Sequence, residues 1–326
     1  MSPGKSRRAK GTKPLAGKVA VVAGATRGAG RGIARALGEA GATVYCTGRS
    51  VRGNPSPYGR PEVIEETAEL ITAAGGAGIA LRVDHTVEGE VEALFAQVER
   101  EQGRLDILAD SVAGQDLILA GWEPTWKTDL SNAELALRQG LLSHVLTAKY
   151  AARLMIKQRR GLIVEVTEGD LLLCGGNILA QLVKFSLKGL ALMLAEELRR
   201  HRVAAIAITP GYLRSEFMLE HFKVTEENWR EHGKKDRYFL ESETPLFVGR
   251  AVAALAADPK VLARTGEVTS SYEVAREYGF TDLDGRQPDP LLKGGMASIP
   301  WFRAALARHG AWLDRLSGRA KKYLRA

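Results

Sequence analysis

Cysteine is scarce in this chain of 326 residues, which contains two, Cys46 and Cys174. Both lie in apolar surroundings, and neither belongs to a CxxC pair or has a histidine at ligand spacing. This pattern excludes a disulfide framework and a cysteine-based zinc site, so we expect no bound metal. Two reduced core thiols are typical of a cytoplasmic protein.

Long apolar runs and aromatic residues are also in short supply. No stretch approaches the roughly 18 apolar residues that span a bilayer, and runs such as Ala251–Ala257 soon end at charges. The N-terminus is charged but has no apolar core, so we expect no secretory signal. Aromatic residues make up 6% of the chain, and without a basic face that carries stacking aromatics we expect no nucleic-acid partner.

The net charge of +8 belongs to the two ends of the chain. Residues 1–14 hold five basic side chains and no acidic one, and residues 286–326 hold nine basic and two acidic ones, which leaves −4 on residues 15–285. We interpret 1–14 as a disordered, solvated arm. In 286–326, apolar residues three and four apart, interleaved with arginines, indicate an amphipathic basic helix. Its apolar face is expected to pack on this chain or a second copy; an anionic membrane surface is the alternative.

Strands and helices alternate once the basic arm ends. Short β-branched runs indicate buried strands, and the longer segments between them indicate helices. The expected strands are 18–23, 43–47, 79–83, 105–109, 162–167 and 203–209, and the expected helices are 31–40, 62–74, 87–102, 130–159 and 177–200. Such long crossovers imply parallel pairing. The predicted fold class is α/β, a single doubly wound Rossmann-type domain with a parallel sheet over 15–285, followed by the C-terminal tail.

A glycine-rich turn follows the first expected strand. It contains Gly24, Thr26, Arg27, Gly28 and Gly30 and leads directly into a helix. Glycines at this point let the backbone approach a pyrophosphate, which then meets the N–H groups at the start of the helix. The position after a strand and before a helix makes the turn a strong indication of a dinucleotide site.

The end of the second expected strand indicates which dinucleotide binds. An NAD site usually has an acidic residue here for the ribose 2′-hydroxyl, but this strand ends Thr47-Gly48-Arg49-Ser50. Arg49 is able to pair with a 2′-phosphate, Ser50 to donate to it, and Arg27 to approach it from the glycine turn. The expected cofactor is therefore NADP(H).

With these motifs in place, residues 15–285 resemble the short-chain dehydrogenase/reductase family. The turn is similar to that family's TGxxxGxG with Ala23 in place of the threonine, and Asp84, followed by His85, stands where the family's acid contacts the adenine. Pro210 and Gly211, with Ser215 four residues after Gly211, match the segment that covers the nicotinamide. The resemblance implies an oxidoreductase that acts on a small molecule, and a homodimer or homotetramer formed through its two long helices.

The catalytic residues depart from the pattern that this resemblance implies. The family uses Asn, Ser, Tyr and Lys, and its tyrosine gives a proton to the carbonyl oxygen while the lysine lowers the tyrosine pKa. Lys184 matches the lysine and Thr167 the serine, but the tyrosine position is Ala180. The active-site asparagine corresponds to Gly140, and Asp110 replaces the first asparagine of NNAG.

Acidic residues gather where the expected catalytic groups are missing. The fifth expected strand ends Glu165-Val166-Thr167-Glu168-Gly169-Asp170, and Asp110 ends its neighbour. These carboxylates could be ordinary loop residues. The functional interpretation is that Glu168, Asp170 or Asp110 replaces the tyrosine as acid or base, or holds a cationic substrate such as an iminium, which accepts hydride without prior protonation.

Other side chains could reach the same gap. Tyr212 is interpreted mainly as packing within a lid, and His144 as a core or interface residue one turn after Gly140. Trp122, Trp126 and Phe217–Phe222 are expected to line an apolar substrate pocket.

Two functions fit these observations. The first is an NADP(H)-dependent reductase or dehydrogenase with another proton donor or an imine-type substrate. The second is a protein of the same fold that transfers no hydride, either a cyclase or isomerase or an NADPH-binding pseudoenzyme. A third possibility, that Ala180 is an introduced substitution, leaves Gly140 and Asp110 unexplained.

Overall fold

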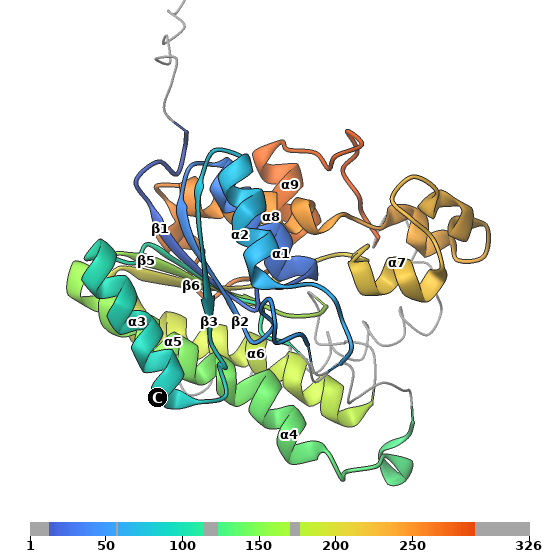
Figure 1. Cartoon of the computed structure of the whole chain (residues 1–326), viewed down its shortest axis with the longest axis horizontal. Helices are drawn as coiled ribbons and strands as arrows, with labels where there is room; N and C mark the ends of the chain where they lie inside the picture. Colours follow the sequence, from blue (N-terminus) through green and yellow to red (C-terminus); the bar gives the residue numbers. More distant parts are fainter. Residues whose placement is uncertain (1–12, 57, 114–122, 170–176, 291–326) are drawn as a thin grey trace, which may run out of the picture.

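The computed structural model describes residues 13–56, 58–113, 123–169 and 177–290. Within these residues seven parallel strands form one sheet in the order β3-β2-β1-β4-β5-β6-β7 (Figure 1). The strands are β1 (Val19–Ala23), β2 (Thr43–Gly48), β3 (Ala77–Arg82), β4 (Ile107–Asp110), β5 (Gly161–Val166), β6 (Val203–Thr209) and β7 (Val268–Ser270). The predicted doubly wound fold is confirmed.

Helices cover both faces of the sheet, as is usual where helical crossovers connect parallel strands. The α-helices are α1 (Gly28–Glu39), α2 (Ile64–Ala73), α3 (Glu88–Gln102), α4 (Ala133–Leu137), α5 (Ser143–Gln158), α6 (Ile178–Leu198), α7 (Glu216–Phe222), α8 (Pro245–Ala257) and α9 (Ser271–Tyr278). Short 3₁₀ turns occupy Thr125–Lys127, Arg199–His201, Trp229–Lys234, Arg237–Glu241 and Val261–Arg264.

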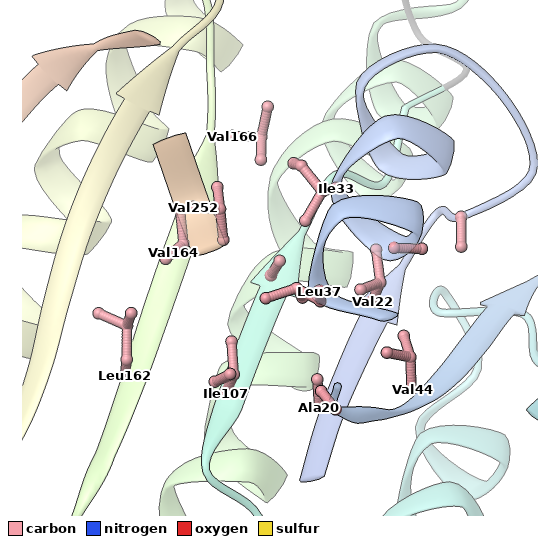
Figure 2. Packing of buried hydrophobic residues seen from close by; sticks show 14 of the residues in the cluster. Ala20, Val22, Ile33, Leu37, Val44, Ile107, Leu162, Val164, Val166 and Val252 are labelled. Atoms are coloured by element: carbon pink, nitrogen blue, oxygen red, sulfur yellow. The ribbon is translucent and has the colours of Figure 1, made fainter. Parts of the chain in front are cut away.

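Two apolar layers hold the helices to the sheet. Figure 2 shows the first, in which Ile33 and Leu37 of α1 and Val252 of α8 lie over the strands with Val22 and Val164. The second layer, on the opposite face, buries residues of α3, α5 and α6 such as Leu94, Met155 and Leu198. Strands buried on both faces explain why the sequence shows continuous apolar runs instead of alternation.

The long helix expected over 130–159 is divided in the structure. Five residues of α4 lead into one π-helical turn, Arg138–Leu142, and α5 then runs to Gln158. Gly140, at the position matched to the family's asparagine, lies buried inside this turn. A single π turn adds one residue to the helix, and a shift this small is hard to recognise in the apolar pattern of the sequence alone.

Several short elements were not predicted. Strand β7 has three residues, and α7 and α9 have seven and eight, lengths at which periodicity carries little information. Helix α8 was recognised only as an apolar run, although Pro245 at its start is a typical first-turn residue.

The folded unit extends slightly past both expected boundaries. Lys13 donates through Nζ to the carbonyl of Ala74 at 2.9 Å, so the part of the expected arm that is described is fixed to the body. At the other end, the Asp289 amide donates to Glu241 at 3.0 Å, and Asp289 is buried. Residues 1–12 and 291–326, which include the rest of the arm and the predicted tail helix, lie outside the described residues.

The expectation that no stretch approaches the length and apolarity of a membrane span is wrong for helix α6 and the 3₁₀ turn after it. The segment Ile178–His201 is long and apolar enough to cross a membrane by length and composition, with a mean hydropathy of 1.6 in its most apolar window. The lysines at 184 and 188 interrupt the apolar run, but the mean hydropathy of the segment stays high enough for a helix that could cross a membrane. Ala195 and Leu198 of this helix are buried in the core beside β6, as in the central helix of a globular protein.

Candidate cofactor and active site

The glycine-rich turn leaves no room for side chains at two positions. Gly24 has φ of +74°, and a Cβ there would lie 2.5 Å from the Ser111 carbonyl oxygen at the end of β4. A Cβ on Gly30 would meet the Gly24 carbonyl oxygen. Glycine is therefore required for the turn to close against β4 and for α1 to begin where it does.

The first amide of α1 carries an acidic partner from a distant segment. The Gly28 N–H donates to Glu216 Oε2 at 2.8 Å, and Arg31 Nη1 lies 3.6 Å from Glu216 Oε1. A carboxylate at a helix N-terminus is favoured by the partial positive charge there. The sequence alone does not indicate this contact, because Glu216 lies 188 residues from Gly28.

The end of β2 presents the predicted phosphate-binding residues. The Arg49 side chain is 30% exposed, and its Nη1 lies 3.9 Å from Asp84 Oδ2. Burial would raise the pKa of Asp84, but the Thr86 hydroxyl and amide that donate to its carboxylate lower that pKa. Ser50 is buried next to Arg49. Arg49, Ser50 and Asp84 lie together at one corner of the sheet, and their contact with a cofactor stays a prediction.

Arg27 does not join this group in the structure. Its Nη1 pairs with Glu62 Oε2 at 3.0 Å, and Arg60 pairs with the same carboxylate. Thr26 is buried behind the turn, and its carbonyl oxygen accepts from Arg31 Nε at 2.9 Å. The Arg27–Glu62 pair is a contact that the sequence did not suggest, so contact of Arg27 with a 2′-phosphate stays a prediction.

His85 is enclosed between two threonines. Its Nε2 lies 2.7 Å from Thr47 Oγ1, and its Nδ1 lies 2.9 Å from Thr147 Oγ1. Thr147 donates to the Ser143 carbonyl oxygen at 2.7 Å, whereas Thr47 lies 3.2 Å from the Val22 carbonyl oxygen. The shorter bond of Thr147 favours the tautomer in which His85 Nδ1 donates to Thr147 and Thr47 donates to Nε2. Burial lowers the pKa of His85 to about 4. Both ring nitrogens are therefore used in linking β2 to α5, and its expected cofactor contact is untested.

Strand β5 and helix α6 bring two of the expected catalytic residues together. Thr167 Oγ1 donates to the Lys184 carbonyl oxygen at 2.8 Å, and Thr167 is buried while Lys184 is half-buried. Asn177 caps the start of helix α6, and its side chain accepts from the amides of Leu179 and Ala180 at 3.0 Å each. Ala180 itself packs with Leu179 and Ala136 of α4 in a small apolar cluster.

Asp110 and Glu165 lie side by side in register at the carboxyl ends of β4 and β5. His144 of α5 contacts both: its Nδ1 is 2.6 Å from Glu165 Oε2 and 3.5 Å from Asp110 Oδ1. Its Nε2 lies 3.0 Å from the Val112 carbonyl oxygen. All three side chains have zero exposure. Burial would lower the pKa of His144, but the charge of Asp110 and the hydrogen bond to Glu165 raise it.

The other acidic candidates are placed differently. Glu168 is exposed at the end of β5. Asp170, Cys174 and Trp122 lie outside the described residues. Asp110 is closed off from solvent by its contacts with His144, so a direct role as acid or base toward a substrate requires that cluster to open.

The segment after β6 is fixed by a buried carboxylate. Gly211, after Pro210, donates its amide to Glu243 Oε2 at 2.9 Å, and the Ser271 hydroxyl donates to the same oxygen at 2.5 Å. Burial raises the pKa of Glu243 to about 8. Ser215 accepts from the Met218 amide at 3.3 Å and so caps α7. Glu243 was missed because nothing in its local sequence marks it as buried.

The expected lid residues form an aromatic cluster. Tyr212 meets the rings of Phe222 and Phe239 edge to face, with centroids 6.4 and 5.2 Å apart, and its hydroxyl donates to Asp236 at 3.2 Å. Tyr212 is therefore a packing residue in the segment after β6, and the role of that segment as a lid stays a prediction. Trp126 is 83% exposed, so it contacts little of the described protein, and Phe217 is 44% exposed.

Comparison with known proteins decides the family. Residues 18–225 match the family model described as short chain dehydrogenase. The mouse protein named dehydrogenase/reductase SDR family member 1 is 36% identical over 303 residues, which are 90% of this chain and 93% of the mouse protein.

The chain is a short-chain dehydrogenase/reductase. A bovine 3-oxoacyl-[acyl-carrier-protein] reductase is 27% identical over 203 residues, which are 61% of this chain and 77% of the bovine protein. Among solved structures, a putative dehydrogenase from Xanthomonas campestris superposes with a TM-score of 0.68 at 22% identity, and covers 85% of this chain and 95% of its own. That likeness concerns the fold. A metagenomic short-chain oxidoreductase in complex with NADP superposes with a TM-score of 0.58 at 25% identity, over 79% of this chain and 96% of its own.

Within this short-chain dehydrogenase/reductase fold, the carboxyl ends of β1, β4 and β5 are the edge at which doubly wound proteins bind ligands. The glycine turn, Thr167 and the cluster of Asp110, His144 and Glu165 all lie at this edge. Family membership establishes an oxidoreductase scaffold. The substrate and the proton donor depend on residues in which this chain differs from the pattern that the family implies.

Proposed function

We propose that this protein is an oxidoreductase that binds NADP(H) in preference to NAD(H). The observation that carries the proposal is the end of β2, where Arg49 and Ser50 stand in place of an acidic residue and the Arg49 guanidinium is partly exposed. A 2′-phosphate brings two negative charges, which an arginine binds through charge-assisted hydrogen bonds. The NADP complex of the metagenomic short-chain oxidoreductase supports the choice.

Fluorescence titration with NADPH and with NADH tests the cofactor. We expect Arg49→Ala to weaken NADPH binding about ten- to a hundredfold and to leave NADH binding nearly unchanged, because only NADPH carries the phosphate. Arg52→Ala is the matched control, since Arg52 lies three residues away but pairs with Glu69 at 2.7 Å. Equal losses for both cofactors, or no binding of either one, would contradict the proposal.

The proposed chemistry is hydride transfer without the family's tyrosine. Lys184 and Ser215 hold the nicotinamide half, and Pro210 and Gly211 cover it. Thr167 supplies a hydroxyl beside Lys184. An imine that binds in its protonated iminium form fits this site, because an iminium carbon accepts hydride with no further proton. An apolar carbonyl compound requires one of Glu168, Asp170 or Asp110 to supply the proton.

A second function is favoured by the packing of Ala180. A methyl group fills the tyrosine position and is buried against Leu179 and Ala136. A cyclase, isomerase or NADPH-binding pseudoenzyme needs no tyrosine. NADPH consumption measured with a set of cyclic imines and a matched set of ketones separates the two functions: turnover of either set supports the oxidoreductase, and binding of NADPH without turnover of any member supports the second function.

We also propose that the protein is a homodimer or homotetramer in the cytoplasm. Leu192 and Met193 of α6 are 52% and 59% exposed, and Leu142 and Val145, at the end of the π turn and in α5, are 52% and 41% exposed. These residues give the two long helices an uncovered apolar surface of the kind that subunit interfaces cover. The Cys46 thiol, which is buried with a pKa raised to about 12 by burial, suits a reducing compartment.

A further inference from the structure

The cluster of Asp110, His144 and Glu165 places two buried acidic side chains against one histidine. Two carboxylates with zero exposure lie next to each other on adjacent strands. Among the residues that the structure describes, His144 is the ion-pair partner that they share. With both carboxyl groups ionised, one imidazolium leaves one negative charge in the core, and a buried unpaired charge is strongly unfavourable. Burial accordingly raises the pKa of Glu165 to about 7.

Two buried oxygen atoms of the cluster also lack partners. Asp110 Oδ2 and Glu165 Oε1 make no hydrogen bond with any described group. Buried carboxylate oxygens without a hydrogen-bond partner are rare in folded proteins. Two such oxygens in one cluster indicate that a bound species uses their lone pairs. A cation with two positive charges neutralises the two carboxylates while His144 is neutral, and it takes carboxylate oxygens as ligands.

His144 has the geometry of a metal ligand. Its Nε2 donates to the Val112 carbonyl oxygen at 3.0 Å, which fixes the tautomer and leaves Nδ1 directed at the two carboxylates. Metal-bound histidines almost always donate their second ring N–H to a carbonyl or carboxylate in this way. The Val112 amide also donates to Asp110 Oδ1 at 3.1 Å, so one peptide segment orients two of the three side chains.

The spacing of the three donor atoms is close to that of a coordination site. His144 Nδ1, one Asp110 oxygen and one Glu165 oxygen all lie within 4.8 Å of one another. Around a tetrahedral ion with bonds of about 2.0–2.2 Å, donor atoms are separated by about 3.3–3.5 Å. The His144–Asp110 distance of 3.5 Å already has this value, and the His144–Glu165 distance of 2.6 Å must lengthen by less than about 1 Å.

We propose that Asp110, His144 and Glu165 bind one divalent transition-metal ion, with Zn²⁺ as the ion to test. The ion replaces the Nδ1 proton of His144 and joins β4, β5 and α5 beneath the cofactor edge of the sheet. A second oxygen of Glu165 or a water molecule completes the coordination. Because every ligand is fully buried, the role of the ion is to position these elements.

The first experiment uses the full-length, tag-free chain. It is freed of metal with a chelator, dialysed, and titrated with Zn²⁺ or with Co²⁺, whose visible spectrum reports tetrahedral nitrogen and oxygen ligands. We expect one equivalent per chain and a rise in unfolding temperature of about 5 °C when Zn²⁺ is present at a hundredfold excess over its dissociation constant. Elemental analysis showing no stoichiometric metal, together with no thermal shift, would overturn the proposal. The explanation would then be a cluster in which His144 and one of the two carboxyl groups are both protonated.

Variants locate the ion. Glu165→Gln and His144→Gln should abolish stoichiometric binding and the Co²⁺ spectrum. Asp106→Asn is the matched control. Asp106 is a buried carboxylate that directly precedes the first residue of β4 and pairs with Lys18 at 2.9 Å. Its substitution should leave the stoichiometry at one metal ion per chain. Metal retained by Glu165→Gln and by His144→Gln alike would show that it binds elsewhere. If the variants do not fold, the wild-type titration still decides whether an ion binds, and the shifted imidazole signals of a Co²⁺-bound histidine decide whether His144 holds it.

Discussion

The Glu216 carboxylate accepts a hydrogen bond from the Gly28 amide at 2.8 Å, so an acidic side chain of α7 occupies the N-terminus of α1. The pyrophosphate of a bound dinucleotide is expected to use the same N–H groups. The two anions therefore compete for one position, and cofactor binding requires Glu216 to move away with or without the rest of α7.

Neutralising Glu216 should strengthen cofactor binding. We expect Glu216→Gln to lower the NADPH dissociation constant about two- to fivefold, since a weaker acceptor replaces an anion at the helix terminus. Isothermal titration calorimetry measures the effect. Glu220→Gln is the control, because Glu220 also joins α7 to the cofactor half, through Arg60, but does not contact the glycine turn. An equal gain in both variants would mean that loosening α7 is the cause.

Restoring a hydroxyl at position 180 should create ketone reduction if the missing proton donor limits the chemistry. We expect Ala180→Tyr to consume NADPH with ketones that the original protein leaves unreacted. Ala180→Phe has nearly the same volume and no hydroxyl, so it should remain inactive. Both variants insert a ring against Leu179 and Ala136 and should lose roughly 1–3 kcal/mol of stability. Activity in the phenylalanine variant would assign the gain to pocket shape.

The buried histidine between two threonines should make folding stability depend on acidity. The pKa of His85 is lowered to about 4 in the folded protein, from 6.5 in the unfolded chain. The stabilisation is fully present above pH 6.5 and is lost as the pH falls toward 4, because only the unfolded chain binds the proton readily. Urea unfolding should show a loss of up to about 3 kcal/mol over this range. His85→Gln should have a lower stability at pH 7 and a flatter profile; a profile unchanged by the substitution would refute the assignment.

The uncovered apolar surface of α6 should hold two subunits together. Leu192→Glu is expected to convert the oligomer to monomers, measured by analytical ultracentrifugation, because it places a charge where apolar contact is proposed. Leu70→Glu tests the same change on α2, which covers the opposite face of the sheet, and should leave the mass unchanged; Leu70 is 41% exposed. A monomeric wild-type protein would reject the interface at once.

The sequence by itself determined the parts that depend on neighbouring residues. The order of strands and helices followed from apolar periodicity. The glycine turn followed from Gly24 and Gly30, which are close in sequence and pack so tightly against each other that a side chain on Gly30 would meet the Gly24 carbonyl oxygen. The absence of an acidic residue after β2 and the presence of Arg49 were also visible, since the residues proposed to contact the cofactor at the end of this strand lie in one short segment of sequence.

Tertiary structure alone decided how charges from distant segments meet. Glu216 reaches Gly28 across 188 residues, and His144 reaches Glu165 across 21 and Val112 across 32. Asp110, predicted at an open site, is buried because β5 lies beside β4 and α5 covers their ends. Parallel sheets place the carboxyl ends of separate strands at one edge, so burial and pairing there depend on strand order and helix position, which no local pattern of residues records.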